Sequence, residues 1–186
     1  MRRDLVEAAG RGDHEAFEVL ATSAGDRLYA VAHLILRSTE LAEDAVQEAL
    51  VRAWQQLPSL RDPDRFDAWL HRLTVNSCLD IARHRRRRPM EVEITPLDAP
   101  MTSDVSGHLA DRELVDQALR GLDPGHRAVV ALHYLLGMPL PQVATSLGIP
   151  VGTAKSRLHY ALAAMRLSAA AEPDTAPGPV TGGQVA

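Results

Sequence analysis

The sequence predicts an all-α protein: two small helical domains joined by a flexible linker, the C-terminal one containing a helix-turn-helix. Three observations lead to this prediction. Apolar residues recur at three- and four-residue steps in both halves of the chain, and no window alternates like a strand with hairpin turns. The middle stretch, 89–108, holds three prolines and no helical periodicity. Near the C-terminus, a single glycine divides two helical patterns.

The N-terminal domain, residues 1–88, is predicted to contain three helices. The first carries one apolar stripe from Phe17 to Ile35. The second spans 40–57, turns its alanines inward and ends at Pro58. The third begins at Asp62-Pro63, a capping residue followed by proline at the first helical position, and runs out into arginines. Its expected buried residues are Phe66, Trp69, Leu70 and Leu73.

Residues 89–108 are predicted to be a flexible acidic linker, because they hold four acidic residues and no lysine or arginine. The C-terminal domain is assigned to 109–171. Helices are expected over 109–119, from Asp123-Pro124 to Leu136, and as two short helices divided by residues 147–150. The tail, 172–186, is rich in proline and glycine and is predicted to be disordered.

Composition excludes several classes of protein. Among 186 residues, 46% are hydrophobic, and Cys78 is the only cysteine, so neither an internal disulfide nor a thiolate zinc cluster is expected. No run of 18 apolar residues or export signal is present, which predicts a cytoplasmic protein without membrane insertion. The eight histidines form no metal motif, and no phosphate loop or nucleophile elbow occurs. No catalytic residue, metal or cofactor is therefore predicted.

The region from Leu140 to Met165 is the most specific motif. A short helix meets Gly148, and a second helix starts near Gly152, which is the layout of a helix-turn-helix. The second helix would enter a DNA major groove and offer its N-terminal amides to phosphate. Its outward donors are Thr153, Lys155, Ser156, Arg157 and His159. A helical hairpin that only packs a small core is the alternative.

A second candidate DNA-binding stretch ends the third helix. Arg83 and residues 85–88 place five arginines within six residues, enough to neutralise several phosphates. Alone, such a run is more often a solvated helix end that the helix dipole favours. Upstream, Arg72, Asn76 and Asp80 share one face. Asn76 could read an unstacked base or cap a buried backbone group.

The helix over 40–57 presents a polar stripe opposite its alanines. Such a contiguous acidic and amide face with an exposed valine suits a partner helix, although most amphipathic helices simply turn a polar face to water. The stripe consists of Asp44, Gln47, Glu48, Val51, Arg52 and Gln55.

Together these stretches resemble the extracytoplasmic-function (ECF) group of bacterial sigma factors. The matching segments are AEDAVQEALVRAWQQL (42–57), RFDAWLHRLTVNSCLDIARHRRRR (65–88) and LRGLDPGHRAVVALHYLLGMPLPQVATSLGIPVGTAKSRLHYALAAM (119–165). The resemblance implies a factor that binds core RNA polymerase and directs promoter-specific initiation. It implies an N-terminal domain that binds and melts the minus-ten element and a C-terminal domain that binds the minus-thirty-five element. An anti-sigma factor is the further partner it implies.

By this resemblance, specific residues take specific roles. Asp44, Gln47, Glu48 and Arg52 fall where the family docks the clamp helices of the largest polymerase subunit, and a further polymerase surface is implied near the C-terminal domain. Residues 152–158 match the recognition helix. The loop that captures a flipped minus-ten base, close to Arg72 and Asn76, corresponds to Leu60, Arg61, Asp62, Asp64, Arg65 and Phe66.

The chain departs from the family's usual residues at four positions of the C-terminal domain, of which Pro139 and Pro141 replace more usual polar residues at the start of the first helix of the pair. Gln142 stands where glutamate is usual, and Tyr160 stands where arginine is usual.

The rival interpretation is an operator-binding regulator that uses only the helix-turn-helix, with a dimerising or sensing N-terminal module.

The length of the linker fits the family: at about 3.3 to 3.6 Å per residue, 20 residues reach roughly 66 to 72 Å. Elements two DNA turns apart are separated by roughly 70 Å.

Overall fold

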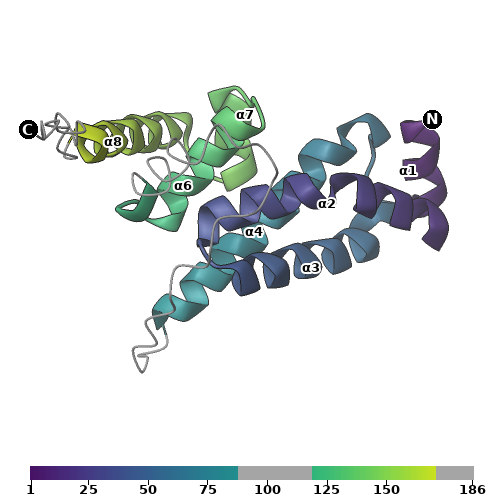
Figure 1. The fold of residues 1–186 in the computed structure, drawn as a ribbon. Coiled ribbons are helices and arrows are strands. Elements are labelled where there is room, and N and C mark those ends of the chain that lie inside the picture. The colour runs from purple at the N-terminus through teal and green to yellow at the C-terminus, as the bar shows by residue number, and fades with distance from the viewer. Residues whose placement is uncertain (88–118, 171–186) are drawn as a thin grey trace, which may run out of the picture.

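The computed structural model of the protein describes residues 1–87 and 119–170, and all its regular elements in these ranges are helices (Figure 1). The all-α prediction is confirmed. The predicted linker and tail, and the helix over 109–119 except its last residue, lie outside the described residues. The N-terminal elements are α1 (Arg2–Gly10), α2 (His14–Leu36), α3 (Thr39–Gln56), η1 (Leu57–Ser59), η2 (Pro63–Arg65) and α4 (Phe66–Arg87).

Side-chain caps define where the N-terminal helices begin. The Asp13 carboxylate accepts a hydrogen bond from the amide of Ala16 at 3.1 Å, and the Ser38 hydroxyl accepts one from Leu41 at 3.4 Å. Asp62 caps η2, which leads directly into α4, so the predicted start of the third helix is confirmed. The helix α1 was not predicted, because its nine residues bury only two, too few for a readable pattern.

Alanines let α3 lie close to its neighbours in the N-terminal core. Ala42, Ala45, Ala49 and Ala53 are all fully buried, which confirms the inward face predicted for this helix. Leu28 and Leu70 complete the same interior from α2 and α4. The indole of Trp69, expected to be buried, is only partly covered and lies beside Phe66, with ring centroids 6.0 Å apart.

The C-terminal elements differ in detail from the prediction. They are α6 (Pro124–Val130), the π-helix η3 (Ala131–Leu135), α7 (Leu140–Leu147) and α8 (Val151–Ala170). The expected helix from 124 to 136 therefore changes to π geometry at Ala131, and the last helix is 20 residues long instead of short. Gly148, with φ of 62°, makes the turn between α7 and α8 that the sequence predicts.

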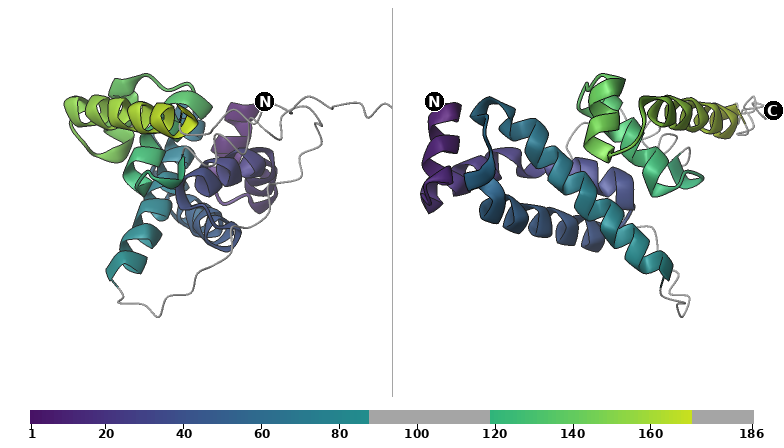
Figure 2. Two further views of the ribbon diagram at one scale, coloured as in Figure 1. Left: turned by 60° about the vertical axis from the view of Figure 1, so that its left-hand side comes forward. Right: turned by 180° about the vertical axis from the view of Figure 1, so that it is seen from behind.

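The two domains pack against each other. Helices α6, η3 and α7 lie along α2 and α4, as both views in Figure 2 show. One apolar cluster runs through both domains, from Val31, Ile35, Val75 and Cys78 to Val129, Leu132 and Val143. The sequence predicted the two helical sets but not this packing between them. None of the described helices is long and apolar enough to span a membrane.

Candidate functional site

The predicted partner-binding stripe of α3 lies on the outside of the N-terminal domain. Asp44, Gln47, Val51 and Gln55 are exposed, and the side chain of Val51 keeps 52% of its surface open to solvent. Glu48 and Arg52 are half-buried. Because the opposite face of α3 is the buried alanine stripe, the helix can bind a second helix through the outer face without losing core contacts.

Ion pairs connect this stripe to α4. Arg52 pairs with Glu48 one turn earlier on α3 and, through Nη1, with Oδ2 of Asp80 on α4 at 3.4 Å. Asp80 also accepts a hydrogen bond from Nη2 of Arg83 at 2.7 Å. Sequence reasoning grouped Asp80 with Arg72 and Asn76 and missed its pairing with Arg52, because the two residues are 28 positions apart and no local pattern links them.

The loop before α4 is mostly open, as the predicted minus-ten surface requires. Arg61, Asp62, Asp64 and Arg65 are exposed, and Leu60 is half-buried. Phe66 is the exception: only 2% of it is exposed, because it packs in the domain core. In this structure its ring anchors the loop to the core. The predicted DNA contact of Phe66 stays a prediction, and it would require the ring to leave the core.

Helix α1 also supports this loop, which the sequence did not suggest. Arg3 Nη1 lies 2.9 Å from Asp64 Oδ2, and Arg2 pairs with Asp67. Within the loop, Arg65 Nε lies 3.2 Å from Asp62 Oδ2. Solvent screens these exposed pairs, so they orient the loop more than they stabilise it.

The rest of α4 presents cations toward its C-terminal end. Arg72, Arg83 and residues 85–87 are exposed, and Asn76 is half-buried. Arg88 lies outside the described residues. The predicted base reader, Asn76, therefore lies on the same helix as a cationic end that suits phosphate.

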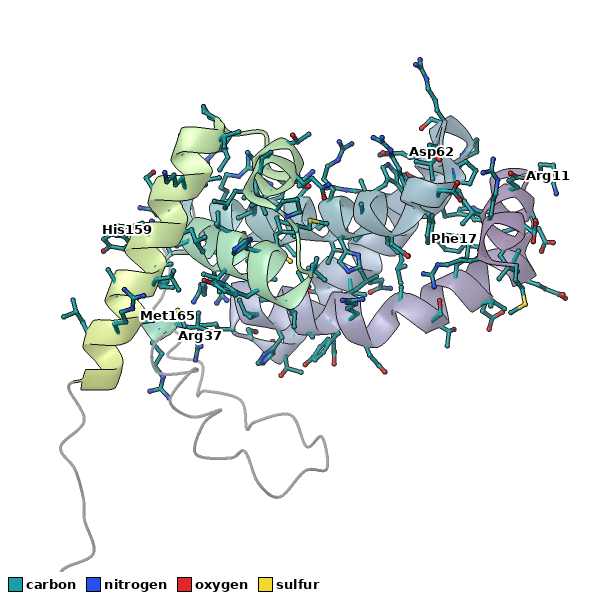
Figure 3. All side chains as sticks on the ribbon, turned by 90° about the horizontal axis from the view of Figure 1, so that it is seen from above. Arg11, Phe17, Arg37, Asp62, His159 and Met165 are labelled. Atoms are coloured by element: carbon teal, nitrogen blue, oxygen red, sulfur yellow. The ribbon has the colours of Figure 1, made fainter. Side chains whose placement is uncertain are left out.

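The helix-turn-helix forms as its motif predicts. Ala144 and Ala154 are buried where α7 and α8 cross, and the amide of Ile149 donates to the carbonyl of Ala144 at 3.0 Å. On α8, Gly152, Lys155, Ser156 and His159 are exposed, whereas Thr153 and Arg157 are half-buried. Figure 3 shows His159 turned away from the other helices, at the opposite end of the molecule from Asp62.

Two buried titratable side chains, His71 and Cys78, lie on α4. A pocket of about 250 Å³ lies between α2, α4 and the turn before α7, lined in part by Arg27, His71 and Met138. Burial lowers the pKa of His71, whose Nδ1–H donates to the carbonyl oxygen of Asp67 at 2.8 Å. Burial raises the pKa of the Cys78 thiol to about 12, so this thiol is not a nucleophile at neutral pH. Among the described residues, no group of three His, Cys, Asp or Glu side chains could hold a metal ion.

Comparisons with known proteins identify a family region in each half of the chain. The model of Sigma-70 region 2 matches residues 20–88, and that of Sigma-70 region 4 matches residues 112–165. The ECF RNA polymerase sigma factor SigL of Mycobacterium tuberculosis is 42% identical over 130 residues, which cover 68% of this chain and 73% of that protein. SigW of Bacillus subtilis is 27% identical over 180 residues, covering 89% of this chain and 95% of SigW.

Two solved structures share the fold. CnrH, in complex with the cytosolic domain of CnrY, matches with a TM-score of 0.66 and 30% identity over 92% of this chain and 99% of CnrH. The sigma factor RpoE of Bartonella quintana, in complex with the anti-sigma factor NepR, matches with a TM-score of 0.60 and 21% identity, covering 83% of this chain and 95% of RpoE.

The fold and the two family regions define a two-domain promoter-recognition factor of bacterial RNA polymerase. More narrowly, the chain belongs to the ECF group of sigma factors. The predicted family and its function in promoter-specific transcription initiation are thereby confirmed. The operator-binding alternative is set aside, because it explains the helix-turn-helix but not the match to region 2.

Proposed function

We propose that three surfaces of the chain have separate functions in polymerase binding and promoter recognition. The outer face of α3 binds the clamp helices of the largest polymerase subunit, and the C-terminal domain lies close to a further polymerase surface. The loop at 60–65 with α4 binds and opens the minus-ten element. The exposed face of α8 reads the minus-thirty-five element. The observation that carries this assignment is that the loop and α8 expose their polar side chains at opposite ends of the molecule (Figure 3).

The minus-ten surface combines two kinds of contact. Arg61, Asp62, Asp64, Arg65 and Leu60 form the rim that receives a flipped base, with Arg72 and Asn76 beside it. Arg83 and residues 85–88 bind phosphates and so position the DNA without choosing its sequence. On α8, Lys155, Ser156, Arg157 and His159 supply donors for base edges, and Gly152 and Thr153 bring the backbone close to phosphate.

The remaining assignments concern the whole protein. The domain limits 1–88 and 109–171 stay a prediction. An anti-sigma factor is proposed as a partner, because RpoE, which shares this fold, was solved with the anti-sigma factor NepR. We propose that the chain acts in the cytoplasm and carries no catalytic residue, because polymerase supplies the chemistry of transcription.

Run-off transcription with purified core polymerase tests the proposal. On a library of promoters, the full chain should direct initiation from a subset that shares one minus-ten and one minus-thirty-five sequence. Replacing the shared minus-ten sequence should abolish strand opening, which permanganate detects. Changes to the minus-thirty-five sequence should weaken recruitment of polymerase to the promoter. Initiation that is independent of the added chain would contradict the proposal.

A further inference from the structure

The recognition helix is not held by the α7 crossing alone, because Arg157 also lies against the first turn of α6. A Cβ atom built on Gly125 would come 3.3 Å from Nη1 and 3.6 Å from Cζ of Arg157. The guanidinium therefore rests directly over the backbone of Gly125. Among the glycines in the described parts of the chain, Gly125 is the only one whose added Cβ would meet another atom within 4 Å.

The surface beneath Arg157 is held in place by its own hydrogen bonds. Asp123 caps α6, and its Oδ1 accepts from the amides of Gly125 at 2.7 Å and His126 at 3.1 Å. Its other oxygen pairs with Nδ1 of His126. Pro124 occupies the first helical position, where its ring restricts φ. A rigid turn thus faces a side chain that is otherwise long and flexible.

Packing on this turn has a consequence for DNA recognition. Arginine loses much rotamer freedom when it binds a base edge, and a side chain that is already oriented loses less. The sides of α8 that carry Lys155, Ser156 and His159 are open, so only Arg157 among these donors is oriented by a neighbouring helix.

We propose that Gly125 is a positioning residue for minus-thirty-five recognition: the missing side chain leaves the space in which the Arg157 guanidinium is oriented for DNA. This inference rests on the proposed role of α8. A methyl group at position 125 would lie 3.1 Å from Asp123 Oδ1 and 3.3 Å from Arg157 Nη1, closer than most real contacts. Both neighbours would have to give way by a few tenths of an ångström: the long side chain of Arg157, and the Asp123 carboxylate that caps α6. The change adds no backbone strain, because Gly125 does not have a positive φ.

The experiment uses the full chain with core polymerase and promoters varied one base pair at a time in the minus-thirty-five element. Gly125→Ala should reduce the preference for the favoured base pair by about threefold to tenfold, a part of the discrimination that one arginine–base pair supplies. Arg157→Ala should reduce it further. The double variant should equal Arg157→Ala alone, because Gly125 acts only through Arg157.

Gly121→Ala is the matched control, since a Cβ at Gly121 meets nothing within 4 Å and should leave promoter preference unchanged. Arg157→Lys tests the same idea without touching Gly125: it keeps the charge but removes the planar group, so the preference should fall. Full preference in Arg157→Lys would overturn the proposal.

The outcomes distinguish the positioning role of Gly125 from the proposed reading of the minus-thirty-five element by Arg157. If Arg157→Ala relaxes base preference but Gly125→Ala matches Gly121→Ala, only the positioning role fails. Additive losses in the double variant would have the same meaning. If Arg157→Ala leaves base preference unchanged, the proposed reading of the minus-thirty-five element by Arg157 fails, and the positioning role fails with it.

Discussion

At the scale of single residues, His71 links burial to pH. Only 7% of the residue is exposed, and burial lowers its pKa, with Arg27 adding a further unfavourable charge. Folding therefore disfavours the protonated form of His71, whereas the histidine of the unfolded chain takes up its proton near pH 6.5. Stability contributed by the neutral form is complete above about pH 6.5 and is lost as the pH falls toward the lower folded-state pKa.

Urea unfolding of the wild type and of His71→Gln checks this prediction. Between about pH 7.5 and pH 5.5, the free energy of unfolding of the wild type should fall more steeply than that of the variant. Glutamine keeps a polar side chain at the position but cannot take up a proton in this range. Equal pH dependence in the two proteins would show that His71 does not titrate differently on folding.

Residue roles were predictable where local spacing decides them. The α3 stripe follows from positions three and four apart, and the structure exposes or half-exposes all six of its residues. The burial of Phe66 was predictable from its apolar spacing, whereas the resemblance marks the whole loop and does not separate the ring that anchors it from the residues that face outward. The Arg52–Asp80 pair depends on how α3 packs on α4, which no pattern along the chain specifies.

At the scale of elements, α3 allows a test of polymerase docking. Asp44 is exposed and lies outside the buried alanine stripe, so Asp44→Lys should weaken binding to core polymerase by about tenfold or more through charge reversal while helicity stays unchanged. Glu48 is a poorer choice, since its replacement would also break the pair with Arg52.

Glu18→Lys is the matched control for this charge change, because Glu18 is exposed on α2 and lies outside the stripe. Pull-down of core polymerase without DNA, together with circular dichroism, measures both effects. Wild-type binding by Asp44→Lys, or an equal loss in Glu18→Lys, would contradict the assignment of α3.

The cationic end of α4 calls for a different measurement. Arg85, Arg86 and Arg87 are exposed, and changing all three to alanine should weaken promoter binding by the holoenzyme alike on every sequence. The slope of log affinity against log salt should become shallower by about 2 to 3, because each phosphate contact contributes about 0.7 to 0.9 to it. Arg83 is left in place because it pairs with Asp80. A loss confined to particular promoters would indicate base reading instead.

Element boundaries show where periodicity stops being informative. The cap and proline at Asp123-Pro124 set the start of α6 as predicted, and α3 begins one residue before the predicted 40. The caps of α2 and α3, Asp13 and Ser38, were not predicted. The π-helix at Ala131–Leu135 has no such signal, because it keeps an apolar pattern while its hydrogen bonding changes, as in the bond from the amide of Leu136 to the carbonyl of Ala131. The helix α8 runs to Ala170 because nothing in its sequence ends it earlier.

At the scale of the whole molecule, the two domains are packed together through one shared apolar cluster. Helices α6 and α7 lie directly against α2 and α4. Promoter elements two DNA turns apart are separated by roughly 70 Å. We predict that the two domains separate when both elements are occupied, and any free energy that the shared cluster contributes opposes that step.

A substitution at Met138 tests the equilibrium between packed and separated domains. It is partly buried against the shared cluster and lines the pocket beside Asp67 and His71. Met138→Asp removes apolar contact, at a cost of about 1 kcal/mol for a half-buried side chain, and sets a second carboxylate near Asp67. Each domain keeps its own helix crossings, so the domains should part without unfolding. Small-angle scattering of the free chain should then give a larger radius of gyration, and core polymerase should bind the variant more tightly.

The control for the opening variant is Tyr134→Asp, which adds the same charge to a side chain that is 59% exposed and outside the cluster. It should leave both the radius of gyration and polymerase binding at wild-type values. A ligand that binds only the separated form binds more tightly when that form is more populated. The radius of gyration and the affinity for polymerase should therefore rise together. An unchanged radius in Met138→Asp with normal helicity would mean that the free chain does not hold its domains together through this contact. Expansion without tighter polymerase binding would mean that domain separation is not what limits assembly.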